Sequence, residues 1–323
     1  MYDNQIKIFH FKNDLKVIIS NFLFNHSTSI GGCRHKPYHS LHEAINDCYD
    51  LSHAMALKAY HLGIPYGGAK SVIYNPNELA FETIAPYVGE SINALKGTYI
   101  ASIDIGIGLN EIDLLSKYTD YVYGTKAHHD PSEYTAQGVI ESIKYLISHI
   151  KKAPNQITIA IQGIGKVGSL IAKYFLEQGS TVYGADINEK QLQIFSSHPN
   201  FKIRHCDDIL TTECDILVPS AGGNVINASN INQLQTNYIC SAANNPIDNP
   251  NLLTDQLYKK GIIFLPDFIT NNGGLLSVAN FFEKNKNKQL SIDCIPKKIQ
   301  SLINEFNGEN LYRITTEQFE VDI

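Results

Sequence analysis

The sequence is short of basic residues, of long apolar runs and of clustered cysteines, and each shortage narrows the functions open to it. Lysine and arginine number 26 against 32 aspartates and glutamates, which gives a net charge of −6. Because binding of phosphate backbones needs a basic surface, this balance argues against a nucleic-acid binder. No apolar run approaches the roughly 20 residues of a membrane helix, and the N-terminus lacks a signal-peptide core, so we expect a cytoplasmic protein without a membrane partner.

The six cysteines are scattered along the chain without any Cys-x-x-Cys pair. This spacing fits reduced thiols better than a disulfide framework or a zinc site. The histidines also lack carboxylates or cysteines at ligand spacing, so no metal site is predicted at His35, His39 and His42 or at His128 and His129. Hydrophobic residues make up 43% of the chain, which indicates a folded rather than a disordered protein.

A chain of 323 residues has room for two domains of ordinary size. Strands that alternate with helices predict an α/β fold, with residues 1–134 and about 275–323 in an α/β catalytic domain and residues 135–274 in a doubly wound Rossmann-type domain across a cleft. The helical segment from 273 onward is expected to pack back on the first domain. Apolar periodicity and capping signals place the elements: strands within 5–24 and at 71–74, 99–105, 157–161, 181–185, 216–218, 238–240 and 262–264, and helices at 41–58, 81–95, 135–150 and 166–178.

A glycine-rich turn marks the second domain as a dinucleotide-binding fold. Its glycines follow an apolar strand and open a helix, so the backbone can approach a pyrophosphate whose charge meets the helix N-terminus: Gly163, Gly165 and Gly168. Asp186, 18 residues beyond Gly168, ends the next strand. A carboxylate there accepts ribose hydroxyls and repels a 2′-phosphate, so NAD is favoured. A turn without a ligand is the alternative, and Asn188 and Lys190 leave room for NADP.

The run Gly67-Gly68-Ala69-Lys70 puts a lysine behind a glycine pair at the start of an apolar strand. A second lysine, Lys58, lies near the end of the preceding helix. Two converging cations are unfavourable unless an anion or a chemical task holds them together. Two solvated surface lysines are the alternative for the isolated residues. Together with the glycine turn, the two lysines predict an enzyme with a nicotinamide cofactor and a lysine base.

Further short motifs are spread in order over about residues 30–280: Gly31-Gly32-Cys33-Arg34, Met55-Ala56-Leu57-Lys58, Gly67-Gly68-Ala69-Lys70, Ile103-Asp104-Ile105-Gly106, Thr135-Ala136-Gln137-Gly138-Val139, the glycine turn, Ala243-Asn244-Asn245, and Pro266-Asp267-Phe268 with Asn271, Gly273 and Gly274. With these motifs the chain resembles the Glu/Leu/Phe/Val amino-acid dehydrogenase family, closest to its leucine and phenylalanine branch. The resemblance implies an NAD-dependent oxidoreductase that deaminates an amino acid reversibly to a 2-oxo acid and ammonia. It also implies a homo-oligomer.

The resemblance implies a role for each matching residue. Lys58 would bind the substrate α-carboxylate, Lys70 would be the base that activates water, and Asp104 would exchange a proton with the substrate amine. Five further residues would contact the substrate: Gly32, Ile30, Thr135, Met55 and Asn271. Of these, Thr135 would also lie near the nicotinamide. The cofactor would be held by the glycine turn and by three neighbouring strand ends: Gly163, Gly165, Lys166, Val167, Gly168, Asp186, Ile187, Ala221, Ala243 and Asn244.

Ile30 stands where the glutamate enzymes of this family carry a lysine for the side-chain carboxylate. An apolar residue would leave that carboxylate unpaired, which is costly, so an apolar substrate of the leucine, valine or isoleucine type is expected. Phenylalanine or tryptophan, or the unusual substrate of a specialised biosynthetic enzyme, is the alternative, since one methylene changes binding by only about 1–3 kcal/mol. Two rivals are a silent NAD-binding regulator, which Lys58, Lys70 and Asp104 together argue against, and a hydroxy-acid dehydrogenase.

Overall fold

The computed structural model describes residues 2–24, 28–124, 131–283, 291–305 and 310–322. Contacts divide the chain into two compact units. Unit 1 comprises Met1–Asp130, Val278–Lys288 and Val321–Ile323, and unit 2 comprises Pro131–Ser277 and Gln289–Glu320. No helix within the described ranges is long and apolar enough to cross a membrane.

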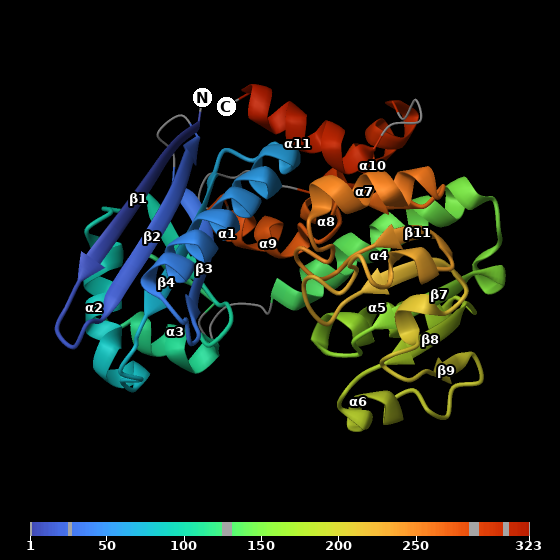
Figure 1. Cartoon of the computed structure of the whole chain (residues 1–323), viewed down its shortest axis with the longest axis horizontal. Helices are drawn as coiled ribbons and strands as arrows, with labels where there is room; N and C mark the ends of the chain where they lie inside the picture. Colours follow the sequence, from blue (N-terminus) through green and yellow to red (C-terminus); the bar gives the residue numbers. More distant parts are fainter. Residues whose placement is uncertain (1, 25–27, 125–130, 284–290, 306–309, 323) are drawn as a thin grey trace. The chain divides into compact units, whose positions relative to one another are not determined.

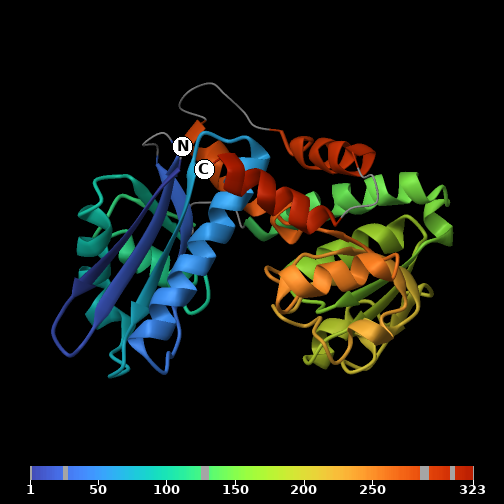
Figure 2. The ribbon, with the colours of Figure 1, turned by 45° about the horizontal axis from the view of Figure 1, so that its top comes forward.

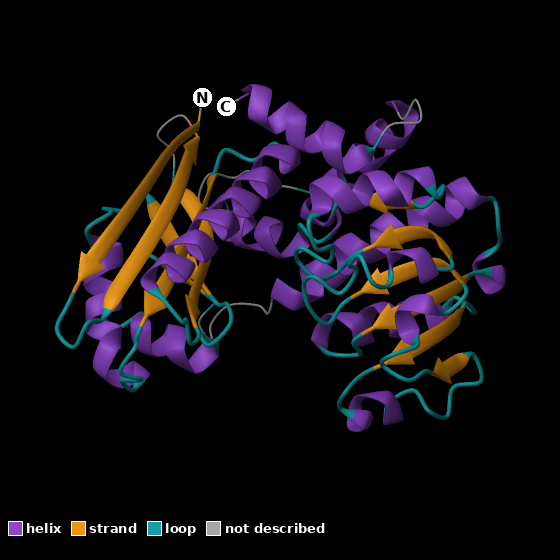
Figure 3. Cartoon of the chain, viewed as in Figure 1, coloured by secondary structure: helices purple, strands orange, loops and turns teal. Residues whose placement is uncertain are grey.

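Unit 1 is built on a six-stranded mixed sheet. Its elements before residue 131 are, in chain order, β1 (Tyr2–His10), β2 (Lys16–Phe24), β3 (Ser29–His35), α1 (Leu41–Leu62), β4 (Gly67–Tyr74), α2 (Phe81–Asn93), β5 (Tyr99–Ser102), α3 (Leu109–Leu115) and β6 (Val122–Tyr123). The strand order is β1-β2-β4-β3-β5-β6, in which β2 runs antiparallel to β1 and β4 and the other neighbours are parallel. Helix α1 covers one face of the sheet, and α2 and α3 cover the other (Figure 1, Figure 3).

Helix α1 begins and ends as its capping residues predict. The Ser40 hydroxyl accepts a hydrogen bond from the Glu43 backbone N–H at 3.1 Å. Gly63 follows the last turn with a φ of 63°, which glycine adopts without strain. Between these ends, Ala44 and Cys48 pack on the sheet with Ile18 and Val72. The helix therefore lies along the sheet, as Figure 2 also shows.

Strand β3 lies outside the strands that the sequence predicts. Gly31 and Gly32 lower its strand propensity, since glycine has no side chain to pack and loses much entropy on folding. The structure nevertheless pairs β3 with both β4 and β5. A Cβ atom at Gly31 would lie 1.6 Å from the Ala69 carbonyl oxygen, so glycine is what lets the two strands approach. Strand β3 therefore forms because of its tertiary packing and not because of its local strand propensity.

Unit 2 contains a six-stranded parallel sheet. The elements from residue 131 onward are α4 (Pro131–Ile150), β7 (Thr158–Gln162), α5 (Lys166–Glu177), β8 (Thr181–Ala185), α6 (Glu189–Gln193), β9 (Phe201–Ile203), β10 (Cys214–Pro219), β11 (Thr236–Cys240), α7 (Pro250–Lys259), β12 (Ile263–Leu265), α8 (Asp267–Thr270), α9 (Gly273–Glu283), α10 (Cys294–Glu305) and α11 (Leu311–Asp322). Every pairing in the order β12-β11-β10-β7-β8-β9 is parallel. The strand order reverses at β7, with β8 and β9 on one side and β10 to β12 on the other, as in a doubly wound fold, and this confirms the predicted fold class.

Residues 275–323 return to the first domain only in part. The contacts place Val278–Lys288 and Val321–Ile323 in unit 1 but Gln289–Glu320 in unit 2, where α10 packs on α4 and α8. At the start of α11, the Asn310 side-chain amide donates to Thr254 Oγ1 and to Asp255 Oδ1, both at 2.7 Å. The Tyr312 ring stacks with Phe264 and meets Phe268 in a tilted arrangement, with centroids 6.1 and 5.6 Å apart. An amphipathic helix carries an apolar face, but its sequence does not say which partner covers that face.

Candidate active site

The α1 face of the first sheet carries the predicted lysine base. Side chains alternate between the two faces of a strand, so residues two apart share a face. On β4 this alternation puts Gly68 and Lys70 under α1, and on β3 it puts Gly32 and Arg34 there. Ala69, between the two β4 residues, belongs to the apolar core on the opposite face. A rigid sheet and a covering helix therefore hold the polar side chains in place.

Glycines on both strands leave the space that this site occupies. A Cβ atom at Gly68 would lie 2.0 Å from the Ala56 backbone nitrogen, so α1 rests directly on β4. A Cβ atom at Gly32 would lie 2.8 Å from Asp104 Cβ and 3.0 Å from Lys70 Nζ. Any side chain at position 32 would therefore press on both groups.

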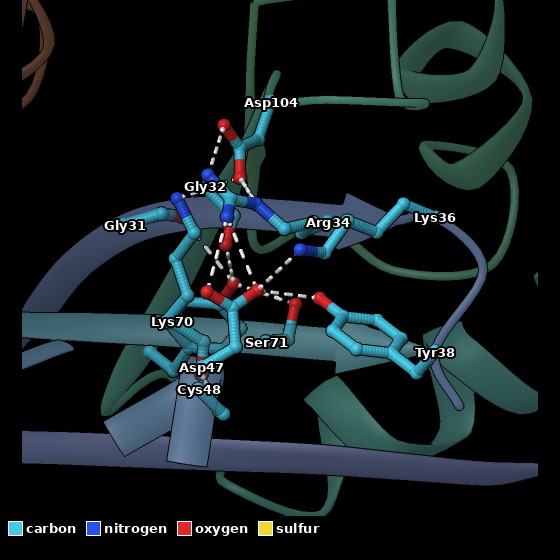
Figure 4. Close-up of polar contacts among 11 residues, drawn as sticks. Gly31, Gly32, Arg34, Lys36, Tyr38, Asp47, Cys48, Lys70, Ser71 and Asp104 are labelled. Atoms are coloured by element: carbon cyan, nitrogen blue, oxygen red, sulfur yellow. Dashed lines mark hydrogen bonds and ion pairs between the residues drawn. The ribbon is translucent and has the colours of Figure 1, made fainter. Parts of the chain in front are cut away.

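Lys70 and Asp104 form a buried ion pair beside Gly32 (Figure 4). Lys70 Nζ lies 2.7 Å from Asp104 Oδ2, and the two side chains are 7% and 18% exposed. Burial by itself raises the pKa of the Asp104 carboxyl, but the Lys70 ammonium and the Arg34 guanidinium outweigh burial and hold this pKa below its usual value. Asp104 is therefore ionised in the neutral range and accepts hydrogen bonds.

A tight turn after β5 directs Asp104 toward the sheet. The Asp104 N–H donates to the Ile107 carbonyl at 3.1 Å, and the Ile107 N–H donates back at 2.9 Å. Gly106 within the turn has a φ of 74°, a conformation that residues with side chains rarely adopt. A Cβ atom there would also lie 1.7 Å from the His35 carbonyl oxygen. The position of the Asp104 carboxylate thus depends on a glycine two residues away.

Arg34 connects Asp104 to a second carboxylate, Asp47 on α1, which the sequence analysis does not single out. Arg34 Nε donates to Asp104 Oδ2 at 2.7 Å, and Nη1 donates to both oxygens of Asp47 at 3.1 and 3.3 Å. The Tyr38 hydroxyl donates to Asp47 Oδ2 at 2.6 Å, and Lys36 Nζ lies 3.6 Å from the same oxygen. Figure 4 shows the resulting row of alternating charges. In the sequence, the signal for Asp47 is an acidic residue beside the apolar stripe of a helix.

The other predicted substrate residues of unit 1 also lie on or under α1. Ile30 shares the β3 face of Gly32 and is 1% exposed. Met55 lies where α1 crosses β4, because its carbonyl carbon is 2.4 Å from the Cβ position of Gly68. Lys58 follows on the same helix and is 8% exposed. Because lysines are rarely buried, the burial of Lys58 and Lys70 contradicts the alternative in which both are solvated surface residues.

In unit 2, the predicted glycine turn joins β7 to α5. Gly163 has a φ of 94° and donates its N–H to the Ala185 carbonyl at 2.8 Å. A Cβ atom at Gly168 would lie 1.9 Å from the Gly163 oxygen, so α5 packs closely on the turn. Gly165, the residue before α5, has no atom within 4 Å of its Cβ position. The N-terminus of α5, where Lys166 and Val167 form the first turn, is therefore open to an anion.

Asp186 lies at the end of β8 beside this turn. Its Oδ2 accepts the Ile164 N–H and its Oδ1 accepts the Asn188 N–H, both at 2.8 Å. These bonds fix a carboxylate where the ribose of a dinucleotide would lie. Ile187, the next residue, is 95% exposed. Ala221, after β10, lies against the turn, with its Cβ 2.9 Å from the Cβ position of Gly163.

Two further polar atoms at these strand ends were not predicted as cofactor contacts. Gln162 Oε1 at the end of β7 and Ser220 Oγ after β10 are buried, and neither has a hydrogen-bond partner among the described residues. Ser220 Oγ lies 3.2 Å from the Cβ position of Gly168. Because buried polar atoms are nearly always satisfied, both fit contacts with a bound group. The open helix end, Asp186 and these two atoms together fit NAD.

Asn271 brings together the remaining predicted residues of unit 2, apart from Thr135. Its Nδ2 donates to the Ala243 carbonyl at 3.2 Å and to Asn244 Oδ1 at 3.1 Å. Because acceptors surround the nitrogen, the amide oxygen faces the other way, and this oxygen is buried without a partner in the described part of the chain. Thr135 Oγ1 donates to the Pro131 carbonyl at 3.1 Å and lies beside Gly274 instead.

Histidines do not assemble into a metal site in the part of the chain that the structure describes, where no group of three or more His, Cys, Asp or Glu side chains could hold an ion. His35 instead lies 3.3 Å from the Asn75 amide nitrogen and faces the Phe81 ring. His128 and His129 lie outside the described residues.

Known proteins match the chain over both units. A family model described as Glu/Leu/Phe/Val dehydrogenase, dimerisation domain, matches residues 10–121, and one described as Glutamate/Leucine/Phenylalanine/Valine dehydrogenase matches residues 184–317. Phenylalanine dehydrogenase of Bacillus thermotolerans is 34% identical over 281 residues, which are 81% of this chain and 72% of that protein. Leucine dehydrogenase of Bacillus subtilis is 31% identical over 276 residues, which are 83% of this chain and 76% of that protein.

Solved structures show the same fold. The crystal structure of L-tryptophan dehydrogenase from Nostoc punctiforme matches with a TM-score of 0.82 and 25% identity, and the match covers 98% of this chain and 94% of that chain. The relatives support the resemblance that the sequence motifs carry. The chain therefore belongs to the glutamate/leucine/phenylalanine/valine dehydrogenase family and is an amino-acid dehydrogenase with NAD as its cofactor.

Proposed function

We propose that this chain catalyses the reversible, NAD-dependent oxidative deamination of an apolar L-amino acid of the leucine, valine or isoleucine type. The observation that carries this proposal is the buried Lys70–Asp104 pair, 2.7 Å apart, on the same sheet face as Ile30. The reaction converts the amino acid, NAD⁺ and water into the 2-oxo acid, ammonium, NADH and a proton. The named relatives act on several different side chains, so the choice of side chain is argued from the site.

The side chains of unit 1 divide the proton chemistry among them. The chemistry that NAD supplies when bound is acceptance of a hydride from the substrate α-carbon. Lys58 offers an ammonium group to the substrate α-carboxylate. Lys70 is the base: after its ammonium has released a proton, the amine takes a proton from the water that attacks the imine carbon. Asp104 Oδ1, whose contact with Arg34 Nη2 is long at 3.5 Å, exchanges a proton with the substrate amine.

The substrate side chain is inferred from the apolar residues beside the ion pair. Ile30 pairs across the sheet with Ile100, and the two are 1% and 6% exposed. A glutamate side chain among them would bring a second carboxylate against two buried apolar side chains, which is costly. Aliphatic substrates therefore fit this face better than glutamate.

An aromatic amino acid is the second candidate, because relatives reported above are named phenylalanine and L-tryptophan dehydrogenases. The test follows ammonia-dependent oxidation of NADH with 4-methyl-2-oxopentanoate, 3-methyl-2-oxobutanoate, phenylpyruvate, indole-3-pyruvate and 2-oxoglutarate. We expect the highest kcat/KM with 4-methyl-2-oxopentanoate. A preference for the aromatic oxo acids would support the second candidate, and a preference for 2-oxoglutarate or a complete lack of turnover would overturn both.

We further propose that the enzyme is a cytoplasmic homo-oligomer that prefers NAD over NADP. The six cysteines are all free, which fits a reducing compartment. The family model that matches residues 10–121 is described as a dimerisation domain, which supports self-association. The Asp186 carboxylate supports the NAD preference, since it would repel a 2′-phosphate. Light scattering and a comparison of the two cofactors test these points.

A further inference from the structure

The Lys70–Asp104 pair belongs to a longer row of charges, of which Arg34 and Asp47 have no part in the proton chemistry described above. It runs from Lys70 through Asp104 and Arg34 to Asp47, so that positive and negative groups alternate (Figure 4). The side chains of Arg34 and Asp47 are 12% and 22% exposed. Because burying charges is unfavourable, we expect a buried row of four charged side chains to have a functional role.

The Arg34 guanidinium is the rigid link in this row. It is planar, and its nitrogens serve two carboxylates at once: Nε is 2.7 Å from Asp104 Oδ2, and Nη1 is 3.1 Å from Asp47 Oδ2. A change at one carboxylate therefore turns the fork at the other. Asp47 is itself held by the Tyr38 hydroxyl at 2.6 Å, and α1 carries its backbone.

We propose that Arg34, Asp47 and Tyr38 are positioning residues for the amine chemistry. Through the Arg34 fork, they hold Asp104 Oδ2 on Lys70 and leave Asp104 Oδ1, whose contact with Arg34 Nη2 is long at 3.5 Å, to receive the substrate amine. The inference rests on the proposed function, because it assigns these residues to the reaction of Lys70 and Asp104. None of the three touches substrate in this scheme, and each acts through Asp104.

The neighbouring thiols and tyrosine hydroxyls stay neutral, so they add no charge to that of the row. Burial raises the pKa of the Cys33 thiol to about 11 and that of the Cys48 thiol to about 12. Burial also raises the pKa of the Tyr99 and Tyr38 hydroxyls well above the usual value. Two further charged groups lie beside Asp47: the Lys36 ammonium, 3.6 Å from Asp47 Oδ2, and Asp50, whose carboxyl pKa is raised by burial and by the Asp47 carboxylate. Loss of the Asp47 charge therefore changes the site by one unit of charge.

The decisive variant is Asp47→Asn, with Asp50→Asn as its control. Asp50, three residues further along α1, loses the same charge, but no hydrogen bond or ion pair joins it to Arg34 in the described part of the chain. We expect Asp47→Asn to lower kcat roughly 10- to 100-fold, because small misplacement of a reacting group has effects of this order. Since NADH binds to unit 2, its dissociation constant should change less than about twofold.

The pH profile separates positioning from a loss of folding. Removing a negative charge disfavours protonated cations nearby, so the ascending limb of log(kcat/KM) for deamination should move to lower pH by roughly half a unit to one unit in Asp47→Asn. Asp50→Asn should leave the limb in place. Arg34→Lys keeps the charge but cannot span two carboxylates, and should lose kcat as strongly as Asp47→Asn. Tyr38→Phe, which keeps the ring, should lose roughly 3- to 10-fold.

The outcomes are distinguishable. Wild-type activity with an oxo acid, ammonia and NADH establishes the proposed function independently of any variant. With the wild type active, kcat and pH profiles in Asp47→Asn and Arg34→Lys that match Asp50→Asn overturn the inference. A lower kcat with an unmoved limb and a lowered Tm also overturns it, because that pattern is structural. If Asp47→Asn does not fold, Tyr38→Phe is the test: the expected loss of kcat supports the inference, and a wild-type kcat overturns it.

Discussion

At the scale of single residues, Lys70 is the group whose removal tests the chemistry most directly. Its ammonium lies 2.7 Å from Asp104 Oδ2, and Asp104 keeps its bond to Arg34 when the lysine is truncated. We expect Lys70→Ala to lower kcat on the order of 10²- to 10⁴-fold, the usual contribution of a general base. NADH binding, followed by fluorescence titration, should persist. Lys117→Ala, which truncates an exposed lysine of the same unit, is the control, and equal turnover in both variants would refute the role of Lys70.

Asp104 gives a pH dependence whose sign follows from its lowered pKa. In the folded protein this pKa lies below the value of about 3.9 of an unfolded aspartate, so ionisation stabilises the fold. That stability is present above about pH 4 and is lost as the pH falls through the folded pKa. The difference in free energy of unfolding between wild type and Asp104→Asn should therefore be constant at neutral pH and shrink toward pH 3. Urea unfolding at several pH values measures it, and a difference that grows in acid would contradict the assignment.

Sequence motifs could identify the residues that are proposed to carry the chemistry but not the residues that hold them. Lys58, Lys70 and Asp104 stand in short local motifs and could be singled out from the sequence alone. Asp47 could not, because its role depends on α1 crossing β3 at Arg34, which is a tertiary contact between segments 13 residues apart. The unsatisfied Gln162 oxygen likewise becomes visible only once the strands are paired.

At the scale of elements, the turn after β5 controls where Asp104 points. Gly106 has a φ of 74°, and a Cβ atom there would meet the His35 carbonyl oxygen at 1.7 Å. Gly106→Ala should therefore lower the free energy of unfolding by about 1–3 kcal/mol. The fold-decrease in kcat should be at least as large as the fold-change in KM. Gly108→Ala is the matched control, because its φ of −97° suits alanine and the nearest atom is the end of the flexible Glu111 side chain. Equal losses in the two variants would show that the turn does not position Asp104.

Elements fixed by local signals are the ones that the sequence predicts well. The strand, glycine turn, helix and strand from β7 to β8 follow one another with short connections, and each carries its own apolar pattern and end signal. β3 is different, because its glycines argue against a strand and its pairing with β4 and β5 overrides them. Its glycines are also what admits Lys70 and Asp104, so the departure from local propensity falls at the candidate site.

At the scale of the whole molecule, the division into units is where sequence reasoning is weakest. Helices α10 and α11 have clear apolar faces, but no strand or turn nearby indicates which core they complete. The structure assigns Gln289–Glu320 to the dinucleotide-binding unit, with Asn310 bonded to Thr254 and Asp255 on α7. The stability of the cofactor unit therefore depends on residues more than 100 positions after the glycine turn.

Tyr312→Ala tests this dependence, because the ring packs on Phe264 and Phe268 of unit 2. Truncating a half-buried aromatic ring costs about 2 kcal/mol, which corresponds to a fall in Tm of about 4–8 °C for a unit of this size. The affected transition should be the one that NADH raises, since a ligand at 100 times its Kd adds about 2.7 kcal/mol to the unit that binds it. Excess NADH should then restore most of the lost Tm. Leu252→Ala, at an exposed leucine of α7, should leave the scan unchanged. If Tyr312→Ala instead lowers the Tm only of a transition that NADH does not raise, α11 contributes to the stability of unit 1 and not of unit 2.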